Sequence, residues 1–498
     1  MTLRAFLPTD AWVRWLLVPA VAFIALAGNT SYLADFWHHL ARGRAIIEGG
    51  RLLDHDIFTC TVAGQPFQDV NWLSQIVYYH LFELGGLALV RVVNAAIVAL
   101  TLFWLVALCK RVSDSLPVSL GIGIAVFLGL WDVLTIRPQT FSLLLFVAMY
   151  DVLGRSERRP GLLVVPPLLM ALWANLHGAF PAGLMLLGCW WLAALWVALA
   201  ERTATHCRRA RRLGLCLAAA ILATLANPYG WGIYLYVAQT SNLAAARGID
   251  EWLRPEFNQL IGLAYFVSLP IVVGLVVVAW KKKTALPTVR ELLLVCCFLP
   301  LACGSVRMVA WWLLAMAPFL ARRIALLWPA TDNSTTLKPN RGASISVVAL
   351  GLAMVFSLPG LQRFNPLMRL RPIDPTTAQV HDAQEFLAGH LDAGRVFSRF
   401  EWGEYVSWAG HPRLKVFLDG RIEIYPDAVW QAYADVTCGQ PNWQAVLDDY
   451  HIDALLLDVN YHRWTGLLPQ VEQSPHWQRR HQVGNAVVFV RGEALAQK

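Results

Sequence analysis

The chain has 498 residues, of which 57% are hydrophobic and 15% are charged, and its formal net charge is +8. Soluble domains usually carry about a quarter charged residues, so a soluble fold for the whole chain is excluded and a lipid environment is indicated. The positive charge does not indicate nucleic-acid binding, because the basic residues gather in short connections between apolar runs, where they set membrane topology.

Apolar runs long enough to cross a bilayer follow one another along the chain. A membrane-spanning helix needs about 20 mostly apolar residues, or somewhat fewer when its ends are anchored. By this criterion the sequence predicts an α-helical polytopic membrane protein with about eleven transmembrane helices. The predicted spans are 12–28, 87–109, 117–135, 138–154, 161–177, 179–200, 213–227, 258–280, 288–303, 305–321 and 343–358.

The connections between these runs determine the predicted orientation. When the N-terminus is placed inside and each run crosses once, every strongly basic connection falls on the cytoplasmic side, as the positive-inside rule requires. These connections are 110–116, 155–160, 201–212, 281–287 and 322–342. The other connections, and everything after the last span, are therefore predicted to be extracytoplasmic.

Two of the predicted outer connections are long enough to hold structure of their own. Residues 29–86 contain helical stretches at 35–49 and 71–83, which are expected to lie at the membrane interface. Residues 228–257 form the second long connection. With the spans, these connections make up a predicted transmembrane module over residues 1–358.

The tail, residues 359–498, has the pattern of a soluble domain. Strand and helix patterns alternate in it, which predicts a small, doubly wound α/β domain on the outer side of the membrane. Strands are expected at 395–400, 414–418, 453–458 and 485–491, and helices at 376–391, 427–436 and 442–450.

The first outer connection carries several ionisable side chains, and such groups near the membrane are candidates for function. Asp35 starts its first helix, His38 and His39 follow one turn later, and Asp69 precedes its second helix. A carboxylate such as Asp35 can accept the proton of an acceptor hydroxyl, as a general base does. The structural alternatives are a carboxylate that stabilises the helix N-terminus at Asp35 and an N-terminal cap at Asp69.

The same connection contains Asp54, His55 and Asp56 in a row. Three consecutive side chains cannot all face one ion on an extended strand, so capping of the following segment is favoured over a metal site. A requirement for a divalent metal is left open.

Three further candidates stand at the outer ends of predicted spans. These are Arg137, His177 and Arg307. A guanidinium at that depth can hold a phosphate with two parallel hydrogen bonds. The alternatives are arginines whose heads extend to the membrane surface and, for His177, an imidazole at the C-terminus of a helix.

Several short stretches of the chain form a recognisable set. They are DFWHHLARG at 35–43, DVNWL at 69–73, Arg137-Pro138, NPYG at 227–230, Glu251-Trp252 and FLDGR at 417–421. Taken together, these stretches resemble the GT-C superfamily of membrane glycosyltransferases. Within it they are most similar to uncharacterised bacterial members related to protein O-mannosyltransferases and to aminoarabinose transferases acting on lipid A. The resemblance implies a bacterial cytoplasmic (inner) membrane location.

The resemblance also implies roles for individual residues. A catalytic carboxylate in the first outer loop matches Asp35, with Asp69 as runner-up, and an assisting carboxylate in the fourth outer loop matches Glu251. The chain departs from two branches of the superfamily, because it has no WWDYG-type motif and because Phe36 follows Asp35 where a protein O-mannosyltransferase has an Asp-Glu pair. The acceptor therefore stays open.

The hypothesis from the sequence is transfer of a sugar from a polyprenyl-phosphate carrier to a glycan, lipid or protein acceptor. Asp35 would deprotonate the acceptor hydroxyl, while Arg307 and Arg137 stabilise the departing phosphate, on which negative charge develops. The histidines named above would contact substrate. No nucleotide sugar is required, because the site is expected to face outward.

Two other classes remain as alternatives. One is a non-enzymatic subunit or transporter of an envelope polysaccharide machine, although a transporter is expected to place charged groups near mid-bilayer. The other is a polymerase or ligase of whole glycans that uses the same carrier. Hydrolases and ATP-driven pumps are poorly supported, because no P-loop, GxSxG, HExxH or GxGxxG stands in a usable context.

Overall fold

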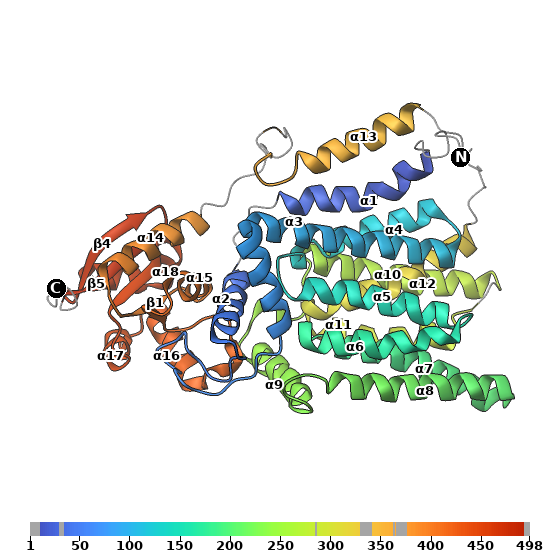
Figure 1. The fold of residues 1–498 in the computed structure, drawn as a ribbon, viewed down its shortest axis with the longest axis horizontal. Helices are drawn as coiled ribbons and strands as arrows, with labels where there is room; N and C mark the ends of the chain where they lie inside the picture. The colour runs from blue at the N-terminus through green and yellow to red at the C-terminus, as the bar shows by residue number, and fades with distance from the viewer. Residues whose placement is uncertain are drawn as a thin grey trace. The chain divides into compact units, whose positions relative to one another are not determined.

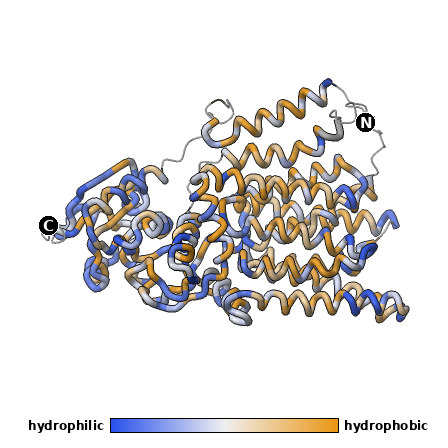
Figure 2. Tube along the Cα trace, viewed as in Figure 1, coloured by the Kyte–Doolittle hydropathy of each residue, from blue (hydrophilic) through white to orange (hydrophobic). Residues whose placement is uncertain are grey.

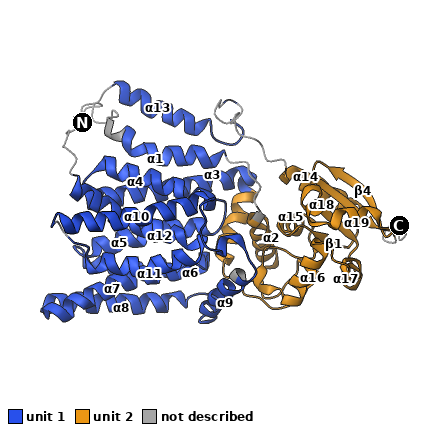
Figure 3. Ribbon diagram, turned by 180° about the vertical axis from the view of Figure 1, so that it is seen from behind, with its two compact units in different colours: residues 1–29, 84–371 blue, residues 30–83, 372–498 orange. Residues whose placement is uncertain are grey.

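The computed structural model describes residues 10–28, 34–283, 286–328, 341–361, 364 and 376–492. Contacts divide the chain into two compact units, which are described separately here (Figure 3). Unit 1 comprises Met1–Asn29 and Leu84–Arg371, and unit 2 comprises Thr30–Glu83 and Pro372–Lys498.

Unit 1 is a bundle of helices (Figure 1). Figure 2 shows that its helices are largely hydrophobic along their lengths, with hydrophilic residues gathered at helix ends. The helices are α1 (Asp10–Ala27), the second part of α3 (Trp72–Ser113), α4 (Leu116–Gly129), α5 (Gln139–Ser156), α6 (Val165–Leu176), α7 (Pro181–Glu201), α8 (Ala204–Thr224), α9 (Gly232–Ala246), α10 (Leu260–Lys281), α11 (Val289–Gly304), α12 (Val306–Leu327) and α13 (Arg341–Val355), with short 3₁₀ turns η2 (Trp131–Val133), η3 (Pro160–Val164) and η4 (Asp250–Trp252).

Each predicted span corresponds to one helix of unit 1. Among the described residues, four helices are both long and apolar enough to cross a membrane: α3, α7, α10 and α12. Others, such as α4 and α13, are apolar but shorter. The prediction of an apolar multi-helix membrane module is therefore confirmed, while the number of eleven crossings stays a prediction.

Helix α12 lies in the core of unit 1. It buries consecutive residues on all its faces, and the indole of Trp312 donates a hydrogen bond to Ser268 Oγ on α10 at 2.8 Å. Helix α4 approaches α10 and α12 closely at Gly129, where an added Cβ would lie 2.7 Å from Ala264. The middle of α12 is therefore surrounded by other helices, as expected for a helix that is apolar on all faces. The first turn of α12 contains Arg307.

Helix α3 combines two predicted elements. The backbone is non-helical at Gly85 and Gly86, so the predicted stretch 71–83 and the predicted span 87–109 form two parts separated by a break. Gly86 has φ +60° and ψ −164°, a conformation that glycine adopts and other residues do not. The boundary between the two units falls just before this break.

Unit 2 is built on a five-stranded sheet in the order β2-β1-β3-β5-β4. The strands are β1 (Gly394–Ser398), β2 (Leu414–Val416), β3 (Ala454–Asp458), β4 (Trp477–Val483) and β5 (Ala486–Arg491). β1 pairs parallel with β2 and β3, whereas β5 pairs antiparallel with β3 and β4. The sheet is therefore mixed, and the prediction of a doubly wound sheet holds only for its parallel part.

Strand β4 was not predicted from the sequence. Its residues are mostly exposed, because it is an edge strand with the polar run Gln478-Arg479-Arg480-His481-Gln482. A strand of this kind lacks the apolar pattern by which strands are recognised, and its position is fixed by pairing with the buried strand β5. Charged side chains also protect an exposed edge from pairing with other chains.

Besides the first part of α3, the described residues of unit 2 form seven helices, several of which pack against this sheet (Figure 1). They are α2 (Ala34–Gly49), α14 (Thr376–His390), α15 (Phe400–Gly410), α16 (Asp427–Thr437), α17 (Trp443–Asp449), α18 (Val459–Thr465) and α19 (Leu467–Gln473), with the 3₁₀ turn η7 (Ile422–Ile424). The predicted helices at 35–49, 376–391, 427–436 and 442–450 are thereby confirmed to within a few residues, whereas α15, α18 and α19 are additions.

The first outer connection is part of this domain. Thr59 pairs with Val416 next to the edge strand β2, and the amide of Cys60 donates to the Val416 carbonyl at 2.9 Å. Val62 is buried in the same core as Phe397 and Phe417. Residues 30–83 therefore fold together with the C-terminal α/β domain rather than as separate helices. The domain boundary predicted at 358/359 itself stays a prediction.

Candidate functional site

Three of the predicted site residues come together in unit 1. Arg137 precedes α5, Glu251 lies in η4, and Arg307 is in the first turn of α12. Arg137 forms an ion pair with Glu251, and Arg307 Nη1 lies 3.9 Å from the other oxygen of the same carboxylate. The guanidinium of Arg307 also lies over the ring of Trp252, 5.2 Å from its centre. Two arginines thus share one carboxylate.

The charge of this cluster follows from its surroundings. Burial raises the pKa of Glu251, but Arg137 and Arg307 lower it by more, so that this pKa lies below its ordinary value of 4.5. The carboxylate is therefore ionised at neutral pH. With two guanidinium groups that stay protonated, the cluster has one surplus positive charge.

Backbone contacts hold this cluster together. Ser305 precedes α12, and its hydroxyl donates to the carbonyl of Glu251 at 3.0 Å. The amide of Val306 donates to the carbonyl of Leu253 at 2.9 Å. These bonds tie the η4 segment to the start of α12, so Glu251 and Arg307 are neighbours although they lie far apart in the sequence.

His177 has a different environment. It ends α6, is buried, and shares a 2.8 Å hydrogen bond with the hydroxyl of Ser142. The indole of Trp173 donates to the same hydroxyl at 2.6 Å. His177 thus has the environment of an imidazole packed at the end of a helix, which is the structural alternative given above. Its contact with substrate stays a prediction.

A second cluster lies in unit 2, around Asp69. This carboxylate is fully buried and accepts hydrogen bonds from Arg42 at 3.0 Å and from the Gln75 amide at 2.7 Å. Arg42 also lies 3.1 Å from the ring nitrogen Nδ1 of His39. The structure thus brings Asp69 and His39 together through Arg42, a residue that sequence reasoning missed although it follows His39 by one helical turn.

The start of α2 lies in the same unit. Asp35 is in the first turn of α2 and is partly exposed, whereas His38 is buried with its Nδ1 3.2 Å from Glu404 Oε1 on α15. The rings of His38 and His39 lie 4.1 Å apart. Glu404 could not be found from the sequence, because α15 was not predicted and its partner lies more than 300 residues away.

The FLDGR motif of the C-terminal part lies against this pair. A Cβ on Gly420 would be 2.1 Å from Glu404 Oε1 and 2.7 Å from His38 Nδ1. Only glycine lets the backbone pass here, which explains the Gly in this motif. Next to it, Arg421 is buried between Asp419 and Asp56, 2.6 Å and 2.5 Å from their oxygens.

Asp54, His55 and Asp56 point to different partners. Asp54 and His55 contact each other, while Asp56 accepts hydrogen bonds from the amides of Phe58 and Thr59 and from Arg421. Asp56 thus accepts amide hydrogen bonds from residues two and three positions ahead, as a capping carboxylate does. In the part of the chain that the structure describes, no three His, Cys, Asp or Glu side chains are placed to hold a metal ion.

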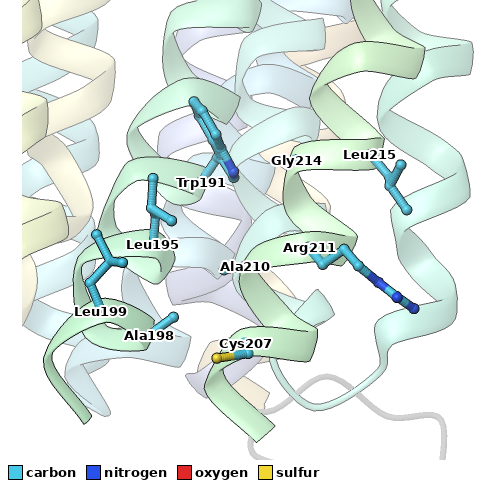
Figure 4. A pocket seen from close by; sticks show the side chains of 9 residues that line it. All are labelled: Trp191, Leu195, Ala198, Leu199, Cys207, Ala210, Arg211, Gly214 and Leu215. Carbon is cyan, nitrogen blue, oxygen red and sulfur yellow. The ribbon is translucent and has the colours of Figure 1, made fainter. Parts of the chain in front are cut away.

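A crevice of about 450 Å³ lies between α7 and α8. Figure 4 shows Trp191, Leu195 and Leu199 along one wall and Arg211 pointing away from them. The lining is mostly apolar and contains no carboxylate or histidine.

Comparison with known proteins gives a likeness of fold. No family model matches the chain, and no curated protein matches its sequence. Among solved structures, the oligosaccharyltransferase of Archaeoglobus fulgidus in its apo form aligns with a TM-score of 0.57 and 11% identity, covering 91% of this chain and 70% of that one. The oligosaccharyltransferase AglB from the same organism, in complex with an inhibitory peptide and a dolichol-phosphate, aligns with a TM-score of 0.57 and 11% identity, covering 90% of this chain and 69% of that one.

Two further structures are similar over almost all of this chain. ArnT from Cupriavidus metallidurans bound to undecaprenyl phosphate has a TM-score of 0.53 and 14% identity, covering 96% of this chain and 98% of that one. The arabinofuranosyltransferase AftD from Mycobacteria has a TM-score of 0.52 and 15% identity, covering 96% of this chain and 40% of that one.

Proposed function

This chain has the fold of the GT-C glycosyltransferases, and from that premise we propose that it transfers a sugar from a polyprenyl-phosphate carrier to an acceptor of the cell envelope. Two of the similar structures hold dolichol-phosphate or undecaprenyl phosphate. The donor we propose is a sugar attached to a lipid phosphate of this kind. The acceptor is a glycan, a lipid or a protein.

The observation that carries this proposal is the cluster of Arg137, Glu251 and Arg307. One carboxylate between two guanidiniums leaves a surplus positive charge, and arginine binds phosphate oxygens in a planar, two-bonded geometry. During transfer the leaving phosphate gains negative charge, so a cation already in place lowers the barrier. Glu251 orients the two arginines and keeps them from repelling each other.

Asp35 is the proposed general base of the reaction. Its partial exposure at the start of α2 supports contact with an acceptor hydroxyl, whereas Asp69 is fully buried and bonded to Arg42 and Gln75. We therefore give Asp69 the supporting role of fixing Arg42 and, through it, His39. A base needs to reach the proton that it takes, which favours the more exposed carboxylate.

Replacement of Arg307 tests the phosphate site. Arg307→Ala should lower kcat/KM for the lipid-linked donor by about 10- to 100-fold, because a hydrogen bond to a charged group contributes about 1.5–3 kcal/mol. Transfer is measured with the purified full chain and a polyprenyl-phosphate sugar. Arg307→Lys should recover part of the loss, since lysine supplies the charge without the planar fork.

The matched control is Arg254→Ala. Arg254 is an exposed arginine three residues after Glu251 in the same segment, and its loss should leave kcat/KM within about twofold, as for most exposed ionic groups. An Arg307→Ala variant with unchanged donor kinetics would remove this arginine from the phosphate site.

The orientation has its own test. We propose that the chain resides in a bacterial cytoplasmic membrane with its C-terminus outside, as the basic connections predict. Alkaline phosphatase fused after Lys498 should be active, and a fluorescent protein that matures only in the cytoplasm should stay dark at the same position. The reverse pattern would contradict the orientation and an outward-facing site together.

A further inference from the structure

A second group of arginines gathers at the other end of the unit 1 bundle. Arg137 and Arg307 stand at the N-terminal ends of α5 and α12, whereas Arg155 and Arg322 stand near the C-terminal ends of the same helices. Figure 2 shows hydrophilic residues at this end of the bundle. The sequence predicts that it faces the cytoplasm.

The arginines at this end are paired with carboxylates in a regular way. Asp151 is buried and forms ion pairs with both Arg111 and Arg155. Glu157 forms ion pairs with Arg209, at 2.9 Å, and with Arg290. Each of these carboxylates is therefore already shared by two guanidinium groups.

A third carboxylate, Glu291, is likewise shared by two arginines. Glu291 is buried and lies 3.5 Å from Arg322 and 2.5 Å from Arg323. Six arginines thus pair with three carboxylates, which leaves an excess of three positive charges among these nine groups. Like charges held this close repel each other, so an anion bound among them would be stabilising.

Five of these nine side chains line an open cavity of about 300 Å³. One arginine of each of the three groups lines it, Arg111, Arg290 and Arg322, together with the carboxylates Glu157 and Glu291, so the lining has one surplus positive charge. Arg290 is held in place over the ring of Trp190, 4.6 Å from its centre, and Tyr150 also lines the wall. Guanidinium groups from three separate elements, α3, α11 and α12, therefore face one space.

We propose that this cavity binds a phosphate group, which the three lining arginines hold as a counter-charge. The positive-inside rule explains why arginines lie on this side, but it requires neither buried pairing nor a common cavity. A phosphate monoester or diester offers several acceptor oxygens to converging guanidiniums, and the cavity has room for a headgroup of that size. The site does not depend on the proposed transferase activity.

Matched variants of the full chain test this proposal. Arg111→Gln and Arg322→Gln remove lining arginines, while Arg155→Gln and Arg209→Gln remove arginines that pair with Asp151 and Glu157 but do not line the cavity in the described structure. Native mass spectrometry of the detergent-purified protein measures retention of phosphatidylglycerol against phosphatidylcholine, and a separate titration measures binding of inorganic phosphate.

The wild type should retain phosphatidylglycerol in preference to phosphatidylcholine, or bind inorganic phosphate. Either ligand should bind about tenfold more weakly to the two lining variants and within about twofold of wild type in the two controls. Arg322→Lys, which keeps the charge, should retain part of the binding. Lipid retention identifies a membrane headgroup as the ligand, and phosphate binding alone identifies a free phosphate.

Two results would overturn the proposal. One is a wild type that neither prefers the anionic lipid nor binds phosphate. The other is an equal loss in the lining and control variants, which would indicate general attraction to a basic surface. Because neither readout uses sugar transfer, failure here leaves the proposed function untouched, and failure of the transferase assay leaves this site untouched.

Discussion

Asp35→Asn should lower the rate of sugar transfer by roughly 10²- to 10⁴-fold, the usual contribution of general-base catalysis. The amide keeps the size and most hydrogen-bonding capacity of the carboxylate but cannot take up a proton at neutral pH. The donor should therefore still bind, so kcat falls while KM changes little. Single-turnover transfer by the purified full chain measures the chemical step separately from binding of the donor.

The controls for this prediction come from the same unit. Asp54→Asn changes an exposed carboxylate of the same segment and should leave transfer within about twofold. Asp69→Asn weakens the pairing with Arg42 and should lower both folding yield and rate. Near-normal transfer in Asp35→Asn, with Glu251→Gln inactive, would move the base to Glu251. Normal transfer in all of these variants would place the base at another residue, and a wild type that transfers no sugar would favour a non-enzymatic role.

Arg421→Met should lower the free energy of unfolding of unit 2 by about 3–5 kcal/mol, as expected when one partner of a buried ionic group is removed. Arg421 is fully buried between Asp56 and Asp419, and methionine would leave both carboxylates in the core without a counter-charge. Urea-dependent proteolysis of the full chain in detergent measures the change.

Two variants control for this effect. Arg413→Met removes an exposed arginine of the same domain and should change stability by about 0.5 kcal/mol or less. Replacing Asp56 and Asp419 by Asn in the Arg421→Met background should recover much of the loss, because the unpaired buried charges are then gone. A single variant as stable as the wild type would show that this buried group does not hold unit 2 together.

The same group makes unit 2 sensitive to acid. Burial raises the pKa of Asp419, but Arg421 and its hydrogen bonds lower it by more, so this pKa lies below its ordinary value of 3.8 in the folded protein. The stabilising contribution is therefore present above about pH 4 and is lost as the pH falls through the lower folded-state pKa. Arg421→Met should remove this part of the acid dependence.

The sequence by itself determined the parts of the protein whose signals are local. Apolar runs located the helices of unit 1 other than α9, because a span is recognised by its own composition. The periodicity of residues 35–49 and the motif around them located α2 with Asp35 in its first turn. The alternation after residue 376 located the strands β1, β2, β3 and β5 of unit 2, since most of their residues are apolar and buried.

Only the tertiary structure decided which of these elements fold together. Residues 30–83 join the C-terminal domain through backbone pairing at Val416, which leaves no trace in the local pattern of either segment. The polar edge strand β4 depends in the same way on its neighbour β5.

The candidate site residues also have partners that are distant in the sequence. Arg137 and Glu251 are 114 residues apart, and Glu404 reaches His38 from a helix that the sequence did not reveal. Periodicity predicts which face of an element is buried, but it does not predict which distant side chain will lie against that face. The ionisable residues could be named from the sequence, whereas the partners that set their charge and orientation followed from packing.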